Sequence, residues 1–219
     1  MPLRHIVVLA VLLGLTACAE QKPVAPSNLQ SAQVVQPDRS VVGRLSYIKP
    51  NTDFRKYNQA IIEPVQIYSG ADTSWGNTSP EDRRILADYM AQKFTPVIDR
   101  YFRPTMAPGP RTLRFRLILV EVEPNVPGLA TLSRLAPAGL VANIAASGTG
   151  NPGSFSGSVT YAVEVFDSES GALLAAGVNK KFPDALDIAS TLSTVDAAKA
   201  GLADGAAQLG RSISSLRAR

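Results

Sequence analysis

Apolar and polar residues alternate along residues 112–123, which is the pattern of a β-strand with one buried face. After residues 118–120 the alternation shifts by one position, so that Val120 and Val122 become the apolar set. Because side chains alternate with a period of two along a strand, this shift predicts a β-bulge or a strand that leaves the core. Before the shift, one face holds four large apolar side chains and the other holds two arginines: Leu113, Phe115, Leu117 and Leu119 against Arg114 and Arg116.

Three other runs predict strands. Residues 60–68 form the first, and Pro64 within it lacks an N–H, so we expect it at a bulge or facing an unpaired side. Residues 159–165 alternate, and residues 173–182 form another run. The Asp-Ser-Glu-Ser-Gly sequence between them ends at Gly171, which tolerates a positive φ, and it predicts a hairpin turn.

A helical period follows Ser79, which is suited to cap the helix, and Pro80, which fits its first turn. Pro96 removes a backbone hydrogen bond, so we expect a kink there or a helix end just before it. The apolar residues at helical spacing predict one buried face: Leu86, Met90, Phe94, Val97 and Tyr101.

A second helix is predicted to begin near Ser193, with Asp196 placed for a capping box. Gly201 and Gly205 each cost about 1 kcal/mol relative to alanine inside a helix, but they permit close packing. The buried stripe of this helix is Leu202, Ala206, Leu209, Ile213 and Leu216.

The order of elements is strand, helix, strand, strand, strand, helix. This order predicts an α+β fold in which two helices pack on one face of a mostly antiparallel four-stranded sheet. The first strand–helix–strand unit is a candidate parallel crossover.

The first residues have the layout of an exported precursor, with a basic start and then an uncharged apolar run. Leu15-Thr16-Ala17-Cys18 resembles the lipobox of bacterial lipoprotein precursors. The resemblance implies signal cleavage between Ala17 and Cys18, lipidation of Cys18 and attachment to a membrane. Ala19 follows rather than aspartate, which by the sorting rule of enteric bacteria resembles an outer-membrane lipoprotein.

Two other interpretations of this terminus remain open. The first is a transmembrane anchor, although such an anchor needs about 20 apolar residues, more than this run provides. The second is an ordinary secretory signal that happens to end at a cysteine.

The chain after the predicted signal peptide, residues 1–17, has 202 of the 219 residues, enough for one domain with a core. Residues 18–40 hold scattered prolines among polar residues and predict a lipidated tether. Residues 41–219 are then one α+β domain with a long Gly/Ala-rich insertion at residues 124–157. If exposed, apolar side chains in this insertion form a docking segment for a partner, and otherwise the insertion folds over the sheet: Leu129, Leu132, Leu135, Leu140, Val141 and Ile144.

Composition excludes several kinds of chemistry. The only histidine, His5, and the only cysteine, Cys18, lie in the signal peptide and at the predicted lipid attachment point. The mature chain therefore has no imidazole or free thiol for Ser-His-Asp or Cys-His catalysis or for a zinc site, and it has no pair of cysteines for a disulfide. There are 22 Lys and Arg against 18 Asp and Glu, and without Arg4 the net charge is +3, too small to indicate a nucleic-acid surface. The Gly148–Gly153 string neither follows a strand nor opens a helix, so we expect no cofactor.

Short motifs along most of the mature chain are similar to a bacterial lipoprotein family, domain of unknown function 3313. The resemblance implies an envelope lipoprotein and brings no catalytic residue with it. The motifs are Tyr47, Pro50, Asp53-Phe54 and Tyr57, then Ile62-Glu63-Pro64-Val65 with Tyr68, then Ser79-Pro80-Glu81-Asp82, Pro137-Ala138-Gly139, and Glu164 with Asp167-Ser168-Glu169-Ser170-Gly171.

Three functions follow as hypotheses. The first is a non-enzymatic accessory or binding module at the periplasmic face of the outer membrane, which contacts a partner protein or a lipid. The second is a carrier of an apolar small ligand or lipid, with Tyr68, Tyr89, Phe94 and Tyr161 lining a pocket or instead filling the core. The third is a carboxylate-based hydrolase that uses Glu121 with Glu123, or Glu164 with Asp167; the alternative is that these are ordinary strand and turn carboxylates. We favour the first.

Overall fold

The computed structural model of the chain describes residues 24–41, 43–123, 157–182 and 193–218. Ala17, Cys18 and the six apolar residues of the predicted docking segment therefore lie outside the described residues.

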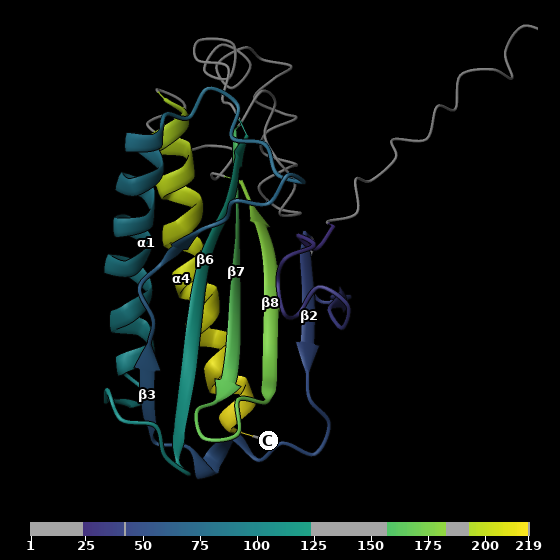
Figure 1. Ribbon diagram of the computed structural model, residues 1–219, viewed down its shortest axis with the longest axis vertical. Coiled ribbons are helices and arrows are strands. Elements are labelled where there is room, and N and C mark those ends of the chain that lie inside the picture. Colours follow the sequence, from purple (N-terminus) through teal and green to yellow (C-terminus); the bar gives the residue numbers. More distant parts are fainter. Residues whose placement is uncertain (1–23, 42, 124–156, 183–192, 219) are drawn as a thin grey trace, which may run out of the picture.

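Eight strands of the described residues form one mixed sheet (Figure 1). They lie in the order β1–β2–β8–β7–β6–β3–β5, and β4 also pairs with β6. The pairs from β1 to β6 are antiparallel, whereas β3 and β4 run parallel to β6, and β5 runs parallel to β3. The strands are β1 (Gln36–Pro37), β2 (Arg44–Ile48), β3 (Gln59–Ile62), β4 (Gln66–Ile67), β5 (Arg103–Pro104), β6 (Thr112–Glu123), β7 (Ser158–Asp167) and β8 (Leu173–Lys181).

The predicted α+β class is confirmed, but the four-stranded sheet is wrong in its strand number, and the sheet is mixed, with four antiparallel and three parallel pairings among the described strands. Strands β1, β4 and β5 have two residues each, too few for a period to show in the sequence. The strand predicted at residues 60–68 is divided into β3 and β4, with Pro64 in the interruption. The predicted crossover through the first helix is parallel, since β3 pairs in parallel with β6.

Both long helices, α1 (Pro80–Asp99) and α4 (Thr194–Arg217), lie on the same side of the sheet (Figure 1). Their starts are as predicted. The Ser79 hydroxyl accepts the Asp82 N–H at 3.1 Å, and the Ser193 hydroxyl accepts the Asp196 N–H at 3.0 Å. The predicted alternative that the first helix ends before Pro96 is wrong, because α1 continues to Asp99.

The main core lies between these helices and the sheet, where the odd-numbered apolar residues of β6 and β7 meet the helix stripes. The predicted bulge is present, because the register between β6 and β7 shifts between Leu119 and Glu121. Val120 lies with Ile118 in the cluster on the opposite face, and the shift brings Val122 to the helix-side core. The prediction that Val120 and Val122 form one apolar set is therefore wrong, because the bulge falls between them and they point to opposite faces.

That opposite face is covered in part by residues 24–35, which belong to the region assigned to the tether. Leu29 and Val35 are buried there against a second apolar cluster that includes Ile118, Val120 and Ala162. Strand β1 then continues this segment into the sheet edge. Much of the described part of the 18–40 region, residues 24–40, is thus packed against the domain.

Helix α4 approaches β7 very closely at two glycines. A Cβ atom on Gly205 would lie 2.5 Å from the Tyr161 hydroxyl, and one on Gly201 would lie 2.7 Å from a Val159 methyl. The glycines therefore serve the close packing that the sequence suggested.

Among the helices of the described residues, none has the length and apolar character required to cross a membrane.

Candidate functional site

The candidate carboxylates Glu121 and Glu123 lie at the end of β6, next to the bulge. The Glu123 carboxylate is 2.6 Å from Lys180 Nζ and accepts the Ser158 hydroxyl at 2.7 Å. Burial alone raises the pKa of Glu123, but these partners outweigh it and hold the pKa below its usual range. Burial, followed by the charge of Glu123, raises the pKa of Glu121. Neither glutamate lines either of the two cavities described below.

The second candidate pair is not one site. The Glu164 carboxylate meets Arg116 and the Ser31 N–H, whereas the Asp167 carboxylate meets Tyr57 and the hairpin turn, so the two groups share no partner. Glu164 has no exposed surface, which makes it the most enclosed charge of the four candidates.

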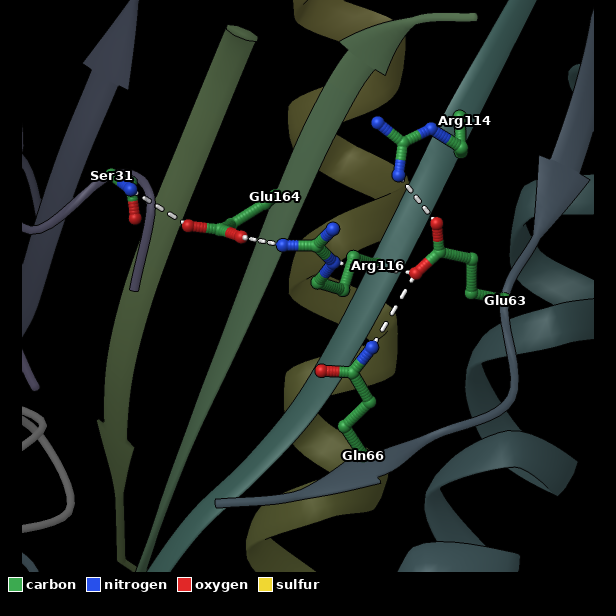
Figure 2. Close-up of polar contacts among 6 residues, drawn as sticks. All are labelled: Ser31, Glu63, Gln66, Arg114, Arg116 and Glu164. Atoms are coloured by element: carbon green, nitrogen blue, oxygen red, sulfur yellow. Dashed lines mark hydrogen bonds and ion pairs between the residues drawn. The ribbon is translucent and has the colours of Figure 1, made fainter. Parts of the chain in front are cut away.

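Glu164 ends a row of alternating charges across β7, β6 and the segment after β3 (Figure 2). Arg116 lies between Glu164 and Glu63, at 3.3 Å from each, and Arg114 binds the other oxygen of Glu63. On the far side of Glu164, the Ser31 N–H donates to its carboxylate at 2.8 Å. We call Glu63, Arg114, Arg116 and Glu164 the charged row. It has no net charge and it fastens residues 24–35 to the sheet.

Each charged group of the charged row forms an ion pair with another member of the row. Burial alone raises the pKa of Glu63, but hydrogen bonds from Arg114 and Arg116 outweigh it and hold the pKa below its usual range. A small cavity of about 170 Å³ borders Arg116 and Glu164, beside Asn28 and Tyr68. Because both charges in its wall are already paired, this cavity presents no free polar group from the charged row.

Asp167 stabilises the hairpin turn. Its carboxylate accepts the Tyr57 hydroxyl at 2.7 Å and the Ser170 N–H at 2.8 Å. Burial alone raises the pKa of Asp167, but these hydrogen bonds outweigh it and lower the pKa to about 2. Gly171 closes the turn with φ at +70°, as its position in the sequence predicted.

We predict that Asp167 makes stability fall in acid. Its pKa of about 2 in the folded chain lies below the ordinary value of 3.8, so its contribution to stability is present above about pH 4, declines below it and is lost as the pH falls through 2. Urea midpoints measured at pH 6, 4, 3 and 2 should therefore converge for wild type and Asp167→Asn as the pH falls. A constant difference between the two chains across this range would contradict the assignment.

The larger cavity lies on the helix side of the sheet, between β2, β8 and the C-terminal half of α4, and its volume is about 320 Å³. This is near the lower limit for small-molecule sites, which are mostly apolar clefts with a few polar groups. Its apolar wall comes from β6 and β7, from the short helix at Phe54–Lys56 and from the residue that precedes β5: Phe54, Phe102, Leu113, Phe115, Val163 and Val165.

Small side chains on two facing elements leave this space open. Ala175 and Gly177 of β8 line one wall, and Ser212 and Ser215 of α4 line the other. A Cβ on Gly177 would meet only the Asn179 side chain closer than 3.5 Å, so this glycine leaves room rather than avoiding a backbone clash.

The polar groups of the larger cavity are incompletely satisfied. Gln208 of α4 is 6% exposed, and neither its oxygen nor its nitrogen has a hydrogen-bond partner in the described part of the chain. Arg44 Nε is likewise buried without a hydrogen bond, although the Asp38 carboxylate lies 3.5 Å away, and Arg44 reaches the Ser212 hydroxyl at 3.4 Å. Buried polar groups are nearly always paired, so these are the atoms that a ligand would satisfy.

Of the four aromatic residues considered for a pocket, only Tyr161 lines the larger cavity. It also packs edge-on against Phe94, which is fully buried in the core. Tyr68 lines the smaller cavity on the opposite face, and Tyr89 packs at the edge of the core beside Lys93 and Lys199.

One known protein family matches this chain over most of its length. The profile of a protein family of unknown function, DUF3313, matches residues 25–209. The chain belongs to the DUF3313 family. The resemblance inferred from its motifs is thereby confirmed.

No curated protein matches this DUF3313 chain. Solved structures with a similar arrangement include PelC dodecamers from Paraburkholderia phytofirmans, one of them a point variant. For the variant, the TM-score is 0.39 at 10% identity, covering 80% of this chain and 95% of that one; for the other PelC crystal, the TM-score is 0.39 at 10% identity, covering 74% and 93%. A DUF4136 family protein from Bacteroides thetaiotaomicron has a TM-score of 0.37 at 10% identity, covering 80% and 96%. These similarities are too distant to bear on function.

Sequence reasoning did not identify Gln208 or Arg44 in this DUF3313 chain, although one signal was present. Five positions of α4 recur at helical spacing beside its apolar stripe, and all but one have small side chains: Gly201, Gly205, Gln208, Ser212 and Ser215. A long amide side chain within a stripe of small residues marks the wall of the cavity. Arg44 has no comparable signal, because it meets Ser212 across 168 residues of sequence.

Proposed function

We propose that this DUF3313 protein is a lipid-anchored, non-enzymatic binding module of the bacterial envelope, at the periplasmic face of the outer membrane. The observation that carries the proposal is the larger cavity, whose mostly apolar wall includes the unpartnered Gln208 amide. Such a combination suits binding, because apolar surface supplies affinity and a few polar groups supply orientation.

The state of the carboxylates supports a non-enzymatic role. Glu123 is paired with Lys180, Glu164 with Arg116, and Asp167 with the hairpin turn. Glu121 has the raised pKa of a possible general acid, but it lies outside both cavities, where no substrate would be enclosed.

Attachment through Cys18 rests on the lipobox in the sequence. It is compatible with the described start of the domain, because Val24 is exposed and only five residues separate it from Cys18. A chain attached in this way would hold the domain close to the membrane surface.

We predict that Cys18→Ser abolishes lipid attachment and releases the protein from the membrane. Labelling with radioactive palmitate and density-gradient fractionation of a bacterial host measure the two effects. Ala19→Ser is the matched control and should behave as wild type, whereas Ala19→Asp should move the protein to the inner membrane if enteric sorting applies. A wild-type chain that takes up no palmitate and appears in the soluble periplasm would contradict the anchor.

The larger cavity also favours the second hypothesis, a carrier of an apolar small ligand. In that case the bound molecule is a cargo rather than a structural or signalling ligand. Exchange of the ligand between the protein and membrane vesicles on a time scale of minutes would support a carrier.

A further inference from the structure

We infer that the larger cavity binds a single-chain anionic amphiphile, with its head group at Gln208 and Arg44 and its apolar chain directed toward Phe54 and Phe102. This inference rests on the proposed binding function and specifies its ligand class.

The polar end of the cavity lies where α4 faces the start of β2. Arg44 pairs in register with Asn179, which pairs with Tyr161, so these three residues form one row across the sheet. Arg44 contacts Ser212 of α4, and Gln208 precedes Ser212 by one helical turn. The buried Arg44 Nε and the Gln208 amide nitrogen are donors without a hydrogen-bond acceptor in the described residues, as an anionic head group requires.

The apolar end lies further along the same strands. Ile48 pairs with Ala175, which pairs with Val165, and all three line the cavity. Ile48 is four residue steps from Arg44 on β2, which corresponds to about 13 Å along the strand. Phe54 and Phe102 line the cavity at the base of the domain. The cavity is therefore a slot with a polar start and a mostly apolar continuation, and at its far end the Arg217 guanidinium lies 5.1 Å from the centre of the Phe102 ring. This shape fits one chain with one head group.

The charges around the slot favour an anion. Arg44, Arg211 and Arg217 line it, against the single carboxylate of Asp38. Arg217 donates to the Tyr57 carbonyl at 2.8 Å, whereas Asp38 accepts the Ser40 hydroxyl at 2.6 Å and also forms an ion pair with Arg44 at 3.5 Å. Arg211 is exposed and has no ion pair in the described part of the chain. Asp38 is the one carboxylate of the lining that opposes an anionic head, and the Gln208 amide must present its nitrogen rather than its oxygen to that head.

Decanoate is the probe for this inference, titrated by calorimetry into residues 18–219 carrying Cys18→Ser, a chain without the predicted signal peptide and without lipid. We expect saturable binding of decanoate and at least tenfold weaker binding of decanol and decylamine. Octanoate should bind more weakly than decanoate by about fourfold per methylene, until the slot is filled. Decyl phosphate distinguishes a carboxylate site from a phosphate site. Equal binding of decanol and decanoate, or no binding of any probe, would overturn the inference.

Two substitutions test the polar end in opposite directions. Gln208→Leu should weaken decanoate binding about tenfold or more and should raise the melting temperature by roughly 2–4 °C, because it removes two unpartnered buried polar atoms. Asp38→Asn should tighten binding roughly two- to fivefold. Gln92→Leu, the same change at an exposed site on α1, is the matched control and should leave binding unchanged.

The outcomes separate this inference from the proposed function. Wild-type affinity for decanoate in both Gln208→Leu and Asp38→Asn would show that the head group does not bind at this end of the slot. That result would not bear on membrane attachment through Cys18. Loss of attachment in Cys18→Ser with intact decanoate binding would leave both statements standing.

Discussion

Arg116→Met is expected to lower the free energy of unfolding by about 3 kcal/mol, because it leaves Glu164 as an unpaired buried charge. Glu164 has no exposed surface, and Arg116 is the cation that contacts it in the charged row. Methionine retains much of the length of the side chain, so the loss reports charge rather than volume. Urea unfolding at pH 7 measures the change.

A second substitution distinguishes charge from packing in this experiment. Arg116→Met combined with Glu164→Gln should recover much of the lost stability, because the amide removes the charge and its oxygen still accepts the Ser31 N–H. Arg84→Met is the matched control, since the Arg84–Glu81 pair has side chains 65% and 67% exposed and should contribute less than about 1 kcal/mol. A double variant as unstable as Arg116→Met would show that packing, not charge, causes the loss.

Gly205→Ala is expected to destabilise the protein by roughly 1–3 kcal/mol, although alanine is the better helix former. The new Cβ would lie 2.5 Å from the Tyr161 hydroxyl and 2.7 Å from two ring carbons, and Tyr161 is itself buried against Phe94. Because Tyr161 packs against Phe94 on one side and borders the larger cavity on the other, the clash is relieved only if the ring shifts toward the cavity or α4 moves away from β7, and either change loses core contacts. Thermal unfolding followed by circular dichroism measures the effect.

Ala207→Gly on the exposed side of α4 provides the matched control for Gly205. This substitution should cost about 1 kcal/mol through helix propensity alone. The two changes are opposite in chemistry, and yet both should destabilise. An increase in stability for Gly205→Ala would mean that the helix and the sheet are less closely packed than the structure shows.

Local signals allowed the sequence to predict both helices and the hairpin. Ser79 and Ser193 cap their helices through residues three positions away, and the turn at Gly171 depends on five consecutive residues. The bulge in β6 was predictable for the same reason, because a change in the period of alternation is visible within one strand.

The remaining features depend on distant partners. Strand β2 has a weak alternation of its own and pairs with β8, which lies more than 120 residues later. The row of charges joins Ser31 to Glu164 across 133 residues, so Glu164 could not be recognised as a buried structural charge from its neighbours. The cavity results from small residues on β8 and α4 that face each other only in the folded chain. No periodic pattern in the sequence marks a space that side chains leave empty.

The packing of residues 24–35 against the sheet would set how far the domain can travel from the proposed lipid on Cys18. If the tether extended from Cys18 to residue 40, its contour length would be about 75 Å, but the six residue steps from Cys18 to Val24 span only about 20 Å. A tether nearly four times shorter would confine the domain to a volume roughly fifty times smaller and would raise its local concentration at the bilayer by the same factor. Encounters would then be restricted to molecules in the membrane or immediately beneath it.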